Sequence, residues 1–296
     1  IRFPTDVKLK WESSKWVFEK QLFKKCSLLH IKRPRSKYLD QKRLQRSYDR
    51  QRRKTYHKGK RRKKSLLYLL DKGLSQLQTL LNAHPAIQLT THERQYLGTI
   101  KKVLQQQQFL QNHSAKELRD RIVSLPKPYV RPIVRGKENK RVEFGMKVHM
   151  LQTDGISYFD TISFNAFNET TRLKTSVLKH KATFGHCHQL GADNIYPTNK
   201  NRKFLTSRRI FTSFVNKGPK KPTKSERRLK AIISTERATA MEGAFGVHKT
   251  AYGLQKIKAK SKANEIVWAF FAVMTANAVQ MAKRRDTGLS SLRQAA

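Results

Sequence analysis

The sequence has 296 residues and carries 64 Lys and Arg against 20 Asp and Glu, a formal net charge of +44 at pH 7. Positive charges at this density repel one another unless a polyanion neutralises them. This favours nucleic acid as the partner over a membrane surface. With 38% hydrophobic residues the chain can fill a core, which excludes a wholly disordered basic tail.

Residues 9–125 show the apolar spacing of helices. Breaks are expected at Pro34, at Pro85 and around residues 112–114. At the last of these, Ser114 and Glu117 have the spacing of a capping box. The pattern predicts three or four helices.

Residues 41–64 are densely basic, with Asp49 as the only acid and with Tyr48 and Tyr56 between the charges. Like charges at this density cost stability unless phosphates neutralise them, so a phosphate-tracking helix is favoured over a solvated face. The candidate DNA contacts in this run are Arg50, Arg52, Arg53, Arg61 and Arg62.

The period changes after a proline-rich boundary at residues 126–132. Residues 142–150 and 156–164 alternate in polarity, and Asp154-Gly155 between them is a strong turn signal. We therefore expect an antiparallel hairpin, followed by a helix over residues 169–181.

The remaining chain continues an α/β order. A short apolar run ends at Asp193, residues 210–215 read as a strand, and residues 217–224 form a basic loop. A helix is expected from Ser225 onward, carrying Glu242. Because ligands gather at strand ends in such folds, both acids are expected on one side of the sheet.

The longest apolar run, residues 266–282, is interrupted by polar residues and is shorter than the roughly 20 residues that span a bilayer. We expect a buried helix and no membrane association. The predicted organisation has a basic helical region over 1–128, a catalytic core over 129–284 and a flexible tail over 285–296.

Several segments together resemble the DDE-type insertion-sequence transposases. Lys249 follows Glu242 by two helical turns, and Asp193 precedes both in Ala192-Asp193-Asn194-Ile195-Tyr196. Further similar segments are Arg131–Lys137, Val142–Lys147, Asn165–Glu169, Asn199–Arg202 and Ala251–Leu254. The similarity extends over essentially the whole chain and is densest from Arg131 to Asn277.

The resemblance implies an RNase H-like core, a mixed sheet flanked by helices, that cleaves and joins DNA at the inverted-repeat ends of an element. It implies two Mg²⁺ or Mn²⁺ ions held by three carboxylates, with Asp193 and Glu242 as the second and third catalytic acids. Hard divalent ions take oxygen ligands, and two of them stabilise the attacking and leaving oxygens of phosphoryl transfer.

Three basic residues near these acids are further DNA-binding candidates. By resemblance, Lys249 contacts phosphates near the scissile bond. Arg237 stands five positions before Glu242, whereas related sequences often place an arginine four before. Arg202 either closes a loop over Asp193 or contacts DNA.

The resemblance places the first catalytic acid on a strand ahead of a stretch like Ile1–Asp6. We therefore expect that strand to precede Ile1, which makes residues 1–128 a helical insertion between the first two core strands. The candidates within the chain are Asp6, Asp154 and Asp160, and Asp154 is better explained as a turn residue.

The leading hypothesis is a transposase that binds double-stranded DNA, at element ends and at the target, and works as a homodimer. One alternative is an inactive transposase remnant that only binds nucleic acid. Another is an RNA-binding or ribosome-associated basic protein. Two distant cysteines, Cys26 and Cys187, offer no disulfide framework, so a cytoplasmic protein is expected. The resemblance to the insertion-sequence transposases implies that it is associated with DNA and of bacterial origin.

Overall fold

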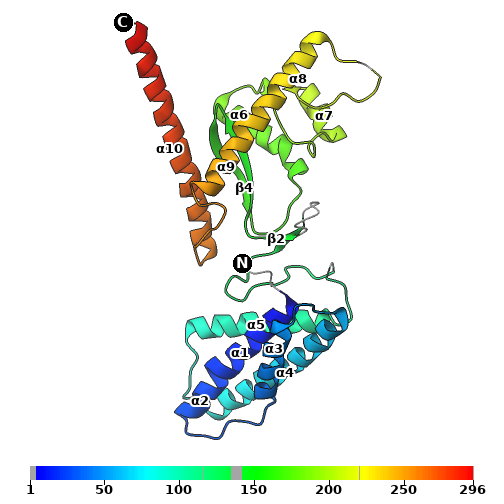
Figure 1. The fold of residues 1–296 in the computed structure, drawn as a ribbon, viewed down its shortest axis with the longest axis vertical. Helices are drawn as coiled ribbons and strands as arrows, with labels where there is room; N and C mark the ends of the chain where they lie inside the picture. Colours follow the sequence, from blue (N-terminus) through cyan, green and yellow to red (C-terminus); the bar gives the residue numbers. More distant parts are fainter. Residues whose placement is uncertain (1–4, 116, 135–141, 220, 296) are drawn as a thin grey trace. The chain divides into compact units, whose positions relative to one another are not determined.

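The computed structural model describes residues 5–115, 117–134, 142–219 and 221–295, with side chains described as far as Asp286 (Figure 1). The chain divides into two compact units, residues 1–145 and 146–296. The division falls later than the predicted boundary at residue 128, because the antiparallel strands β1 (Pro132–Val134) and β2 (Val142–Phe144) belong to the first unit.

The first unit is built from helices, and a break after Arg50 adds to those that the sequence predicts. Its helical segments are α1 (Asp6–Lys15), η1 (Trp16–Leu22), α2 (Phe23–Leu28), α3 (Tyr38–Arg50), α4 (Tyr56–Ala83) and α5 (Thr91–Phe109). The first three are continuous, and the breaks around Pro34 and Pro85 are confirmed. At the third break, the Ser114 N–H donates to Glu117 Oε1 at 2.9 Å, but the segment forms a turn instead of starting a helix.

The core of the first unit lies between α1–η1 and α4. Phe18, Leu66 and Leu70 are wholly buried there. Gly73 of α4 faces Phe18 so closely that an added Cβ would lie 2.5 Å from the ring. The helices therefore approach closely only because this position has no side chain.

We expect Gly73→Ala to destabilise the protein by about 1–3 kcal/mol, because the methyl group displaces Phe18 in a packed core. Gly98→Ala in α5 is the matched control: nothing lies within 4 Å of its added Cβ. Relief of glycine's helix penalty predicts a stabilisation of roughly 0.5–1 kcal/mol there. Urea denaturation measures both, and equal effects of the two substitutions would contradict the packing of α4 on Phe18.

The second unit begins with the predicted hairpin. Strands β3 (Lys147–Thr153) and β4 (Ile156–Ser163) pair antiparallel, with an irregularity between His149 and Met150. Asp154 and Gly155 both have positive φ, 47° and 69°, which confirms the tight turn. The expected strand over residues 142–150 is interrupted, because Gly145 has a φ of 142° and separates β2 from β3.

A helix and a small parallel sheet follow the hairpin. The predicted helix over 169–181 is confirmed as η2 (Glu169–Arg172) continued by α6 (Leu173–Phe184). Strands β5 (Gln189–Leu190) and β6 (Phe211–Thr212) pair parallel, and α7 (Asn199–Thr206) connects them. The sequence reasoning missed α7, although Thr198 caps it by accepting the Asn201 N–H.

The last part of the chain is helical, as predicted. Its segments are α8 (Lys224–Glu236), the π-helical η3 (Arg237–Met241), α9 (Glu242–Thr250) and α10 (Lys262–Ala295). A capping box of Thr223 and Glu226 starts α8. Residues 285–295, expected as a flexible tail, form the end of α10.

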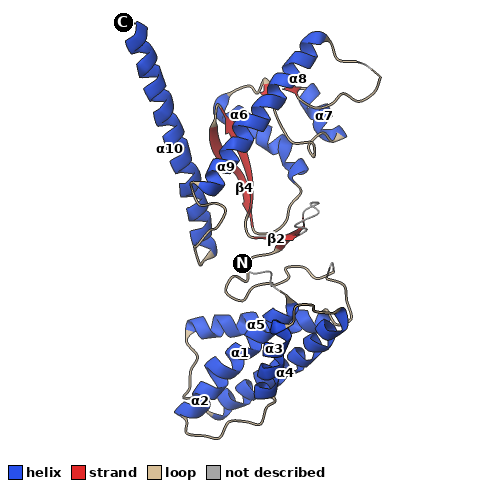
Figure 2. Cartoon of the chain, in the orientation of Figure 1, coloured by secondary structure: helices blue, strands red, loops and turns tan. Residues whose placement is uncertain are grey.

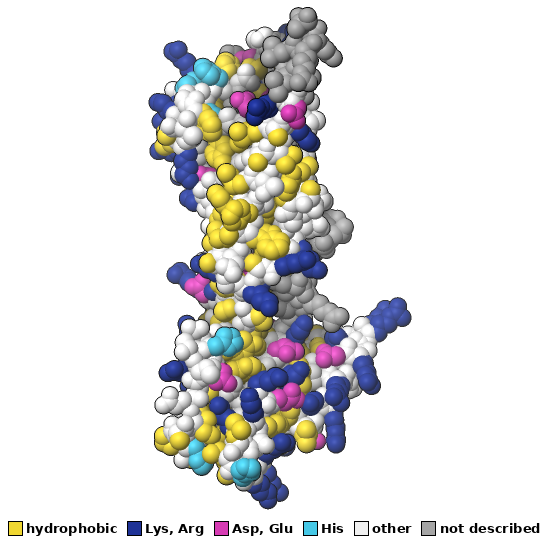
Figure 3. Space-filling model, turned by 90° about the vertical axis from the view of Figure 1, so that its left-hand side faces the viewer, with side chains coloured by type: hydrophobic (Ala, Val, Ile, Leu, Met, Phe, Trp, Pro, Cys, Tyr) yellow, Lys and Arg dark blue, Asp and Glu magenta, His cyan; other side chains and the backbone are white. Residues whose placement is uncertain are grey.

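Helix α10 is buried on one face only, so the prediction of a buried apolar helix is corrected. Asn277 fixes one face, exchanging two hydrogen bonds with the Ser157 backbone at 2.7 and 2.9 Å, and Val273 is buried. Other apolar side chains, including Phe271 at 63% exposed, cover its free face (Figure 3). By length and composition alone, 262–286 is the single segment of the described chain apolar enough to cross a membrane, which is weak evidence.

The protein thus combines helices with small sheets, compatible with an α/β class (Figure 2). The described strands pair only in twos, as β1–β2, β3–β4 and β5–β6. The predicted order of hairpin, helix, strand, strand and helix is present, with α7 inserted between the last two strands.

Candidate metal and nucleic-acid site

Asp193 lies in a surface turn between β5 and α7. Its side chain is exposed, and its carboxylate accepts the Asn194 N–H at 2.7 Å. Its backbone carbonyl accepts the Tyr196 N–H at 3.0 Å. Strand β5 ends at Leu190, so Asp193 stands in the loop beyond the strand and not at its last residue.

Glu242 begins α9, and its carboxylate lies 3.1 Å from the Arg237 guanidinium. In a regular α-helix, residues five apart do not face each other, whereas the i→i+5 geometry of η3 brings these two together. The five-residue spacing of Arg237 and Glu242 is therefore accommodated by a local widening of the helix. Arg237 has a carboxylate partner, and its contact with DNA stays a prediction.

The Asp193 turn packs on the helix that carries Glu242. A Cβ added at Gly191 would lie 3.3 Å from Ile233 Cγ2 and 3.4 Å from Arg237 Cβ. Gly191 thus allows the turn to approach the end of α8 and the start of η3. The two predicted acids come from neighbouring segments, and Lys249 is exposed in the last turn of α9.

The two carboxylates suit a hard divalent cation, because Mg²⁺ and Mn²⁺ prefer oxygen ligands. A cation at Glu242 has to displace the Arg237 guanidinium, which is possible because the Glu242 side chain is 62% exposed. Within the described residues, no group of three or more His, Cys, Asp or Glu side chains is placed to hold a metal. The chain therefore fits the three-carboxylate pattern only in part.

The three in-chain candidates for the first acid each occupy a position with a structural role of its own. Asp6 belongs to the first unit, where Arg121 Nη2 lies 2.7 Å from its carboxylate. Asp154 occupies the hairpin turn. The side chain of Asp160 has no exposed surface and is held by protein partners. Each acid thus has a structural task where it stands.

The basic run over residues 41–64 is two helices and not one. Helix α3 ends at Arg50, and Arg52 and Arg53 lie in the loop before α4. Arg50, Arg52, Arg53 and Arg61 are exposed, as a phosphate-binding role requires.

Arg62 departs from this pattern because it is buried, at 6% exposed. Its guanidinium donates to Gln45 Oε1 at 2.9 Å, to the Gln41 carbonyl at 2.7 Å and to the Gln41 side chain. The structure therefore gives Arg62 the task of tying α4 to α3, with no guanidinium nitrogen presented to DNA.

A second concentration of positive charge lies beside the Asp193 turn. Between residues 194 and 235 the only acid is Glu226, which caps α8. We name the exposed basic residues of this segment the α7–α8 basic surface: Lys200, Lys203, Arg208, Arg209, Lys217, Lys221, Lys224, Arg227 and Arg228. From the sequence, residues 217–224 were expected as a basic loop and Arg202 was the only DNA-binding candidate in this segment, although the near absence of acids was a readable signal.

This surface is held together by contacts between its segments. Lys217 Nζ donates to Asn199 Oδ1 at 2.6 Å, which links the loop after β6 to the start of α7. Lys230 of α8 donates to the Phe214 carbonyl at 2.9 Å. Arg202 is half-buried, donates to the Pro197 carbonyl at 3.1 Å and lies over Phe214, which favours loop closure for it.

A buried polar chain lies behind the Asp193 turn. The Asp160 carboxylate accepts from His149 Nδ1 at 2.9 Å and lies 2.8 Å from Lys179 Nζ, while His149 Nε2 is 2.8 Å from the Tyr196 hydroxyl. Burial opposes the charge of Asp160, but its Lys179 and His149 partners outweigh burial and lower its pKa to about 2. Burial and the nearby Glu169 carboxylate raise the pKa of Tyr196.

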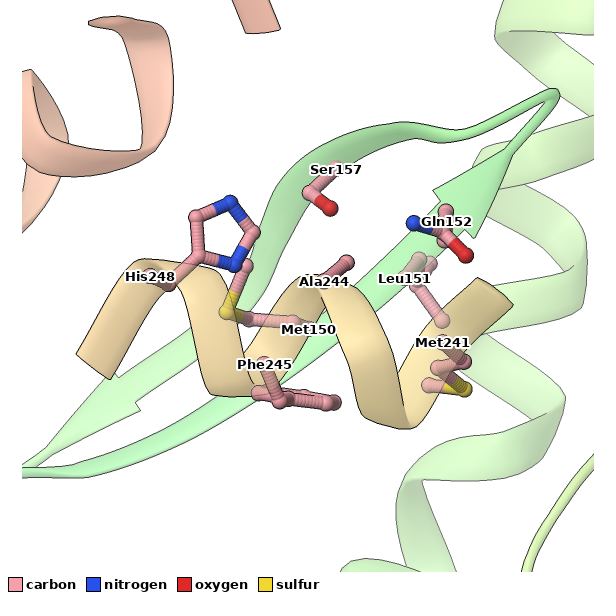
Figure 4. A pocket seen from close by; sticks show the side chains of 8 residues that line it. All are labelled: Met150, Leu151, Gln152, Ser157, Met241, Ala244, Phe245 and His248. Atoms are coloured by element: carbon pink, nitrogen blue, oxygen red, sulfur yellow. The ribbon is translucent and has the colours of Figure 1, made fainter. Parts of the chain in front are cut away.

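A small pocket between η3–α9 and the hairpin shows how the Glu242 helix docks (Figure 4). Met150 and Ser157 of the hairpin and Met241, Phe245 and His248 of the helix line it. It holds about 10 Å³, room for one water at most. His248 Nδ1 has no hydrogen-bond partner among the described residues, and burial lowers the pKa of His248. The pocket is a packing feature and too small for a substrate.

Comparison with known proteins finds no family, no curated protein and no solved structure that matches this chain.

Proposed function

We propose that this protein is a DDE-type transposase that binds double-stranded DNA and cuts it with divalent metal ions at Asp193 and Glu242. One observation carries the proposal: the two exposed carboxylates and the α7–α8 basic surface belong to the same unit and to adjoining segments. Oxygen ligands beside a phosphate-binding surface are what metal-dependent phosphoryl transfer requires.

The protein groups have distinct tasks in this proposal. The basic surface holds backbone phosphates, and Lys249 contacts a phosphate near the bond that is cut. Asp193 and Glu242 hold Mg²⁺ or Mn²⁺, which when bound supplies charge stabilisation for the attacking and leaving oxygens. The fold of the unit is proposed to be an RNase H-like core, and the acting form a homodimer on element ends and target DNA in a bacterial cytoplasm.

The alternative is a protein that binds DNA without cutting it. Two observations favour it: Glu242 is already paired with Arg237, and the described residues provide no third acid at the pair. A site with one ligand missing binds metal weakly and misplaces the scissile phosphate.

Nicking of a supercoiled plasmid in the presence of Mn²⁺ separates the two functions. If Asp193 and Glu242 hold the catalytic metal, the purified chain nicks the plasmid, and Asp193→Asn and Glu242→Gln reduce the rate by at least about 100-fold. The dissociation constant for a random-sequence duplex should stay unchanged in both variants, because neither acid contacts phosphate directly. Glu236→Gln, which neutralises an exposed acid of α8, is the matched control.

Salt-dependent duplex binding with no nicking by the unmodified chain would establish the DNA-binding alternative. Nicking that persists in both variants would place the catalytic metal elsewhere, and an absence of duplex binding would contradict both functions.

A further inference from the structure

The buried polar chain of Asp160, His149 and Tyr196 ends at the residue that closes the Asp193 turn. Because a carboxylate only accepts, His149 Nδ1 donates to Asp160, and Nε2 faces the Tyr196 hydroxyl at 2.8 Å. All three residues are buried, at 7%, 8% and 9% exposed for His149, Asp160 and Tyr196. These three side chains therefore join strands β3 and β4 to the Asp193 turn through the interior of the unit.

Tyr196 is fixed at its backbone as well as at its hydroxyl. Its N–H donates to the Asp193 carbonyl at 3.0 Å, and its carbonyl accepts from Asn201 Nδ2 at 2.9 Å. Asn201 also donates to the Thr170 carbonyl at 2.9 Å, which ties the turn to η2. A displacement of the Tyr196 ring is therefore transmitted directly to the backbone of Asp193.

The hydroxyl of Tyr196 is not placed to act on DNA itself. Its ring is buried, and both burial and Glu169 raise its pKa, which disfavours the phenolate that a nucleophile would need. The same burial makes it a firm anchor, since a buried hydroxyl without its partner costs about 1–3 kcal/mol.

We propose that Asp160, His149 and Tyr196 are positioning residues that hold the Asp193 carboxylate where metal-dependent cleavage requires it. This inference rests on the function proposed above. A carboxylate on an unsupported turn samples many positions, whereas a metal ligand is effective only when held close to its productive geometry. The hydrogen-bonded chain of Asp160, His149 and Tyr196 supplies that support, starting from the wholly buried Asp160 carboxylate on the neighbouring hairpin.

Tyr196→Phe tests the inference because it removes only the hydroxyl. The hydroxyl contacts His149 Nε2 at 2.8 Å and Glu169 Oε2 at 3.4 Å. Hydrogen exchange of the peptide covering residues 191–198 should become faster by about tenfold, as expected for the loss of these contacts. In Mn²⁺-dependent nicking, kcat should fall with KM for the plasmid unchanged. His149→Gln, whose amide keeps a donor and an acceptor, should retain more of the protection than His149→Leu.

The matched control is Tyr158→Phe. The Tyr158 hydroxyl is also part-buried on β4, but it bonds Thr153 Oγ1 at 3.2 Å, at the turn end of the hairpin. This substitution should leave exchange over residues 191–198 and kcat unchanged.

Unchanged exchange in Tyr196→Phe would overturn the inference whatever the cleavage result. Faster exchange with normal kcat would also overturn it, because the turn would then be free to move without consequence. Faster exchange in a chain that never nicks DNA would instead contradict the proposed function and leave the anchoring of the turn established.

Discussion

Replacing Lys200, Lys203, Arg208 and Arg209 together with glutamine is expected to weaken duplex DNA binding by at least about 100-fold at 0.1 M salt. These four residues are exposed on α7 and the turn after it, and no described acid pairs with them. The effect should grow as the salt concentration falls.

The magnitude follows from counterion release. Each phosphate neutralised on B-DNA contributes about 0.9 to the slope of log K against log salt, roughly a tenfold gain in affinity at 0.1 M. The loss of four such contacts corresponds to an affinity about 10⁴-fold lower. The other basic residues of the protein still bind DNA and make the observed loss smaller. Fluorescence anisotropy with a labelled duplex over a series of salt concentrations measures both the affinity and the slope.

A variant with the same change in charge is needed as control, because any loss of four charges lowers long-range attraction. Lys174, Lys181, Lys256 and Lys260 are exposed in the same unit but outside the α7–α8 basic surface. Their replacement by glutamine should leave the salt slope nearly unchanged. Equal losses in the two variants would show that net charge, and not this surface, holds the DNA.

Local signals in the sequence were sufficient for the parts of the fold that depend on local geometry. Asp154-Gly155 fixed the hairpin because a tight turn requires positive φ at both positions. Pro34 and Pro85 marked the helix breaks because proline disfavours a continued helix. The hairpin and the helix breaks at Pro34 and Pro85 were therefore predictable, whereas α7 was not.

Features that depend on contacts between distant segments were not predictable in this way. The burial of Arg62 depends on the way α3 folds back on α4, and the exposure of α10 depends on which of its faces meets β4. A fixed helical repeat cannot reveal the π-helical segment that joins Arg237 to Glu242. The candidate acids were identifiable from residue type and spacing, whereas their supports come from other elements.

Asp160→Ala is expected to destabilise the second unit by about 1–3 kcal/mol, because it leaves the buried His149 Nδ1–H without its acceptor. The effect should depend on pH. The pKa of Asp160 is about 2 in the fold against an ordinary 3.8, so its stabilisation of about 2 kcal/mol is present above pH 4 and is lost as the pH falls toward 2.

Hydrogen exchange of the β3–β4 amides in the full chain measures this stability within the second unit alone. Asp193→Ala is the matched control, because its carboxylate is exposed in a turn, and its cost should stay below about 0.5 kcal/mol. Similar costs for the two substitutions would mean that Asp160 is not the anchor of the polar chain. A large difference would show that the buried Asp160 carboxylate, and not the exposed Asp193, stabilises the second unit, as its role as the anchor of the polar chain requires.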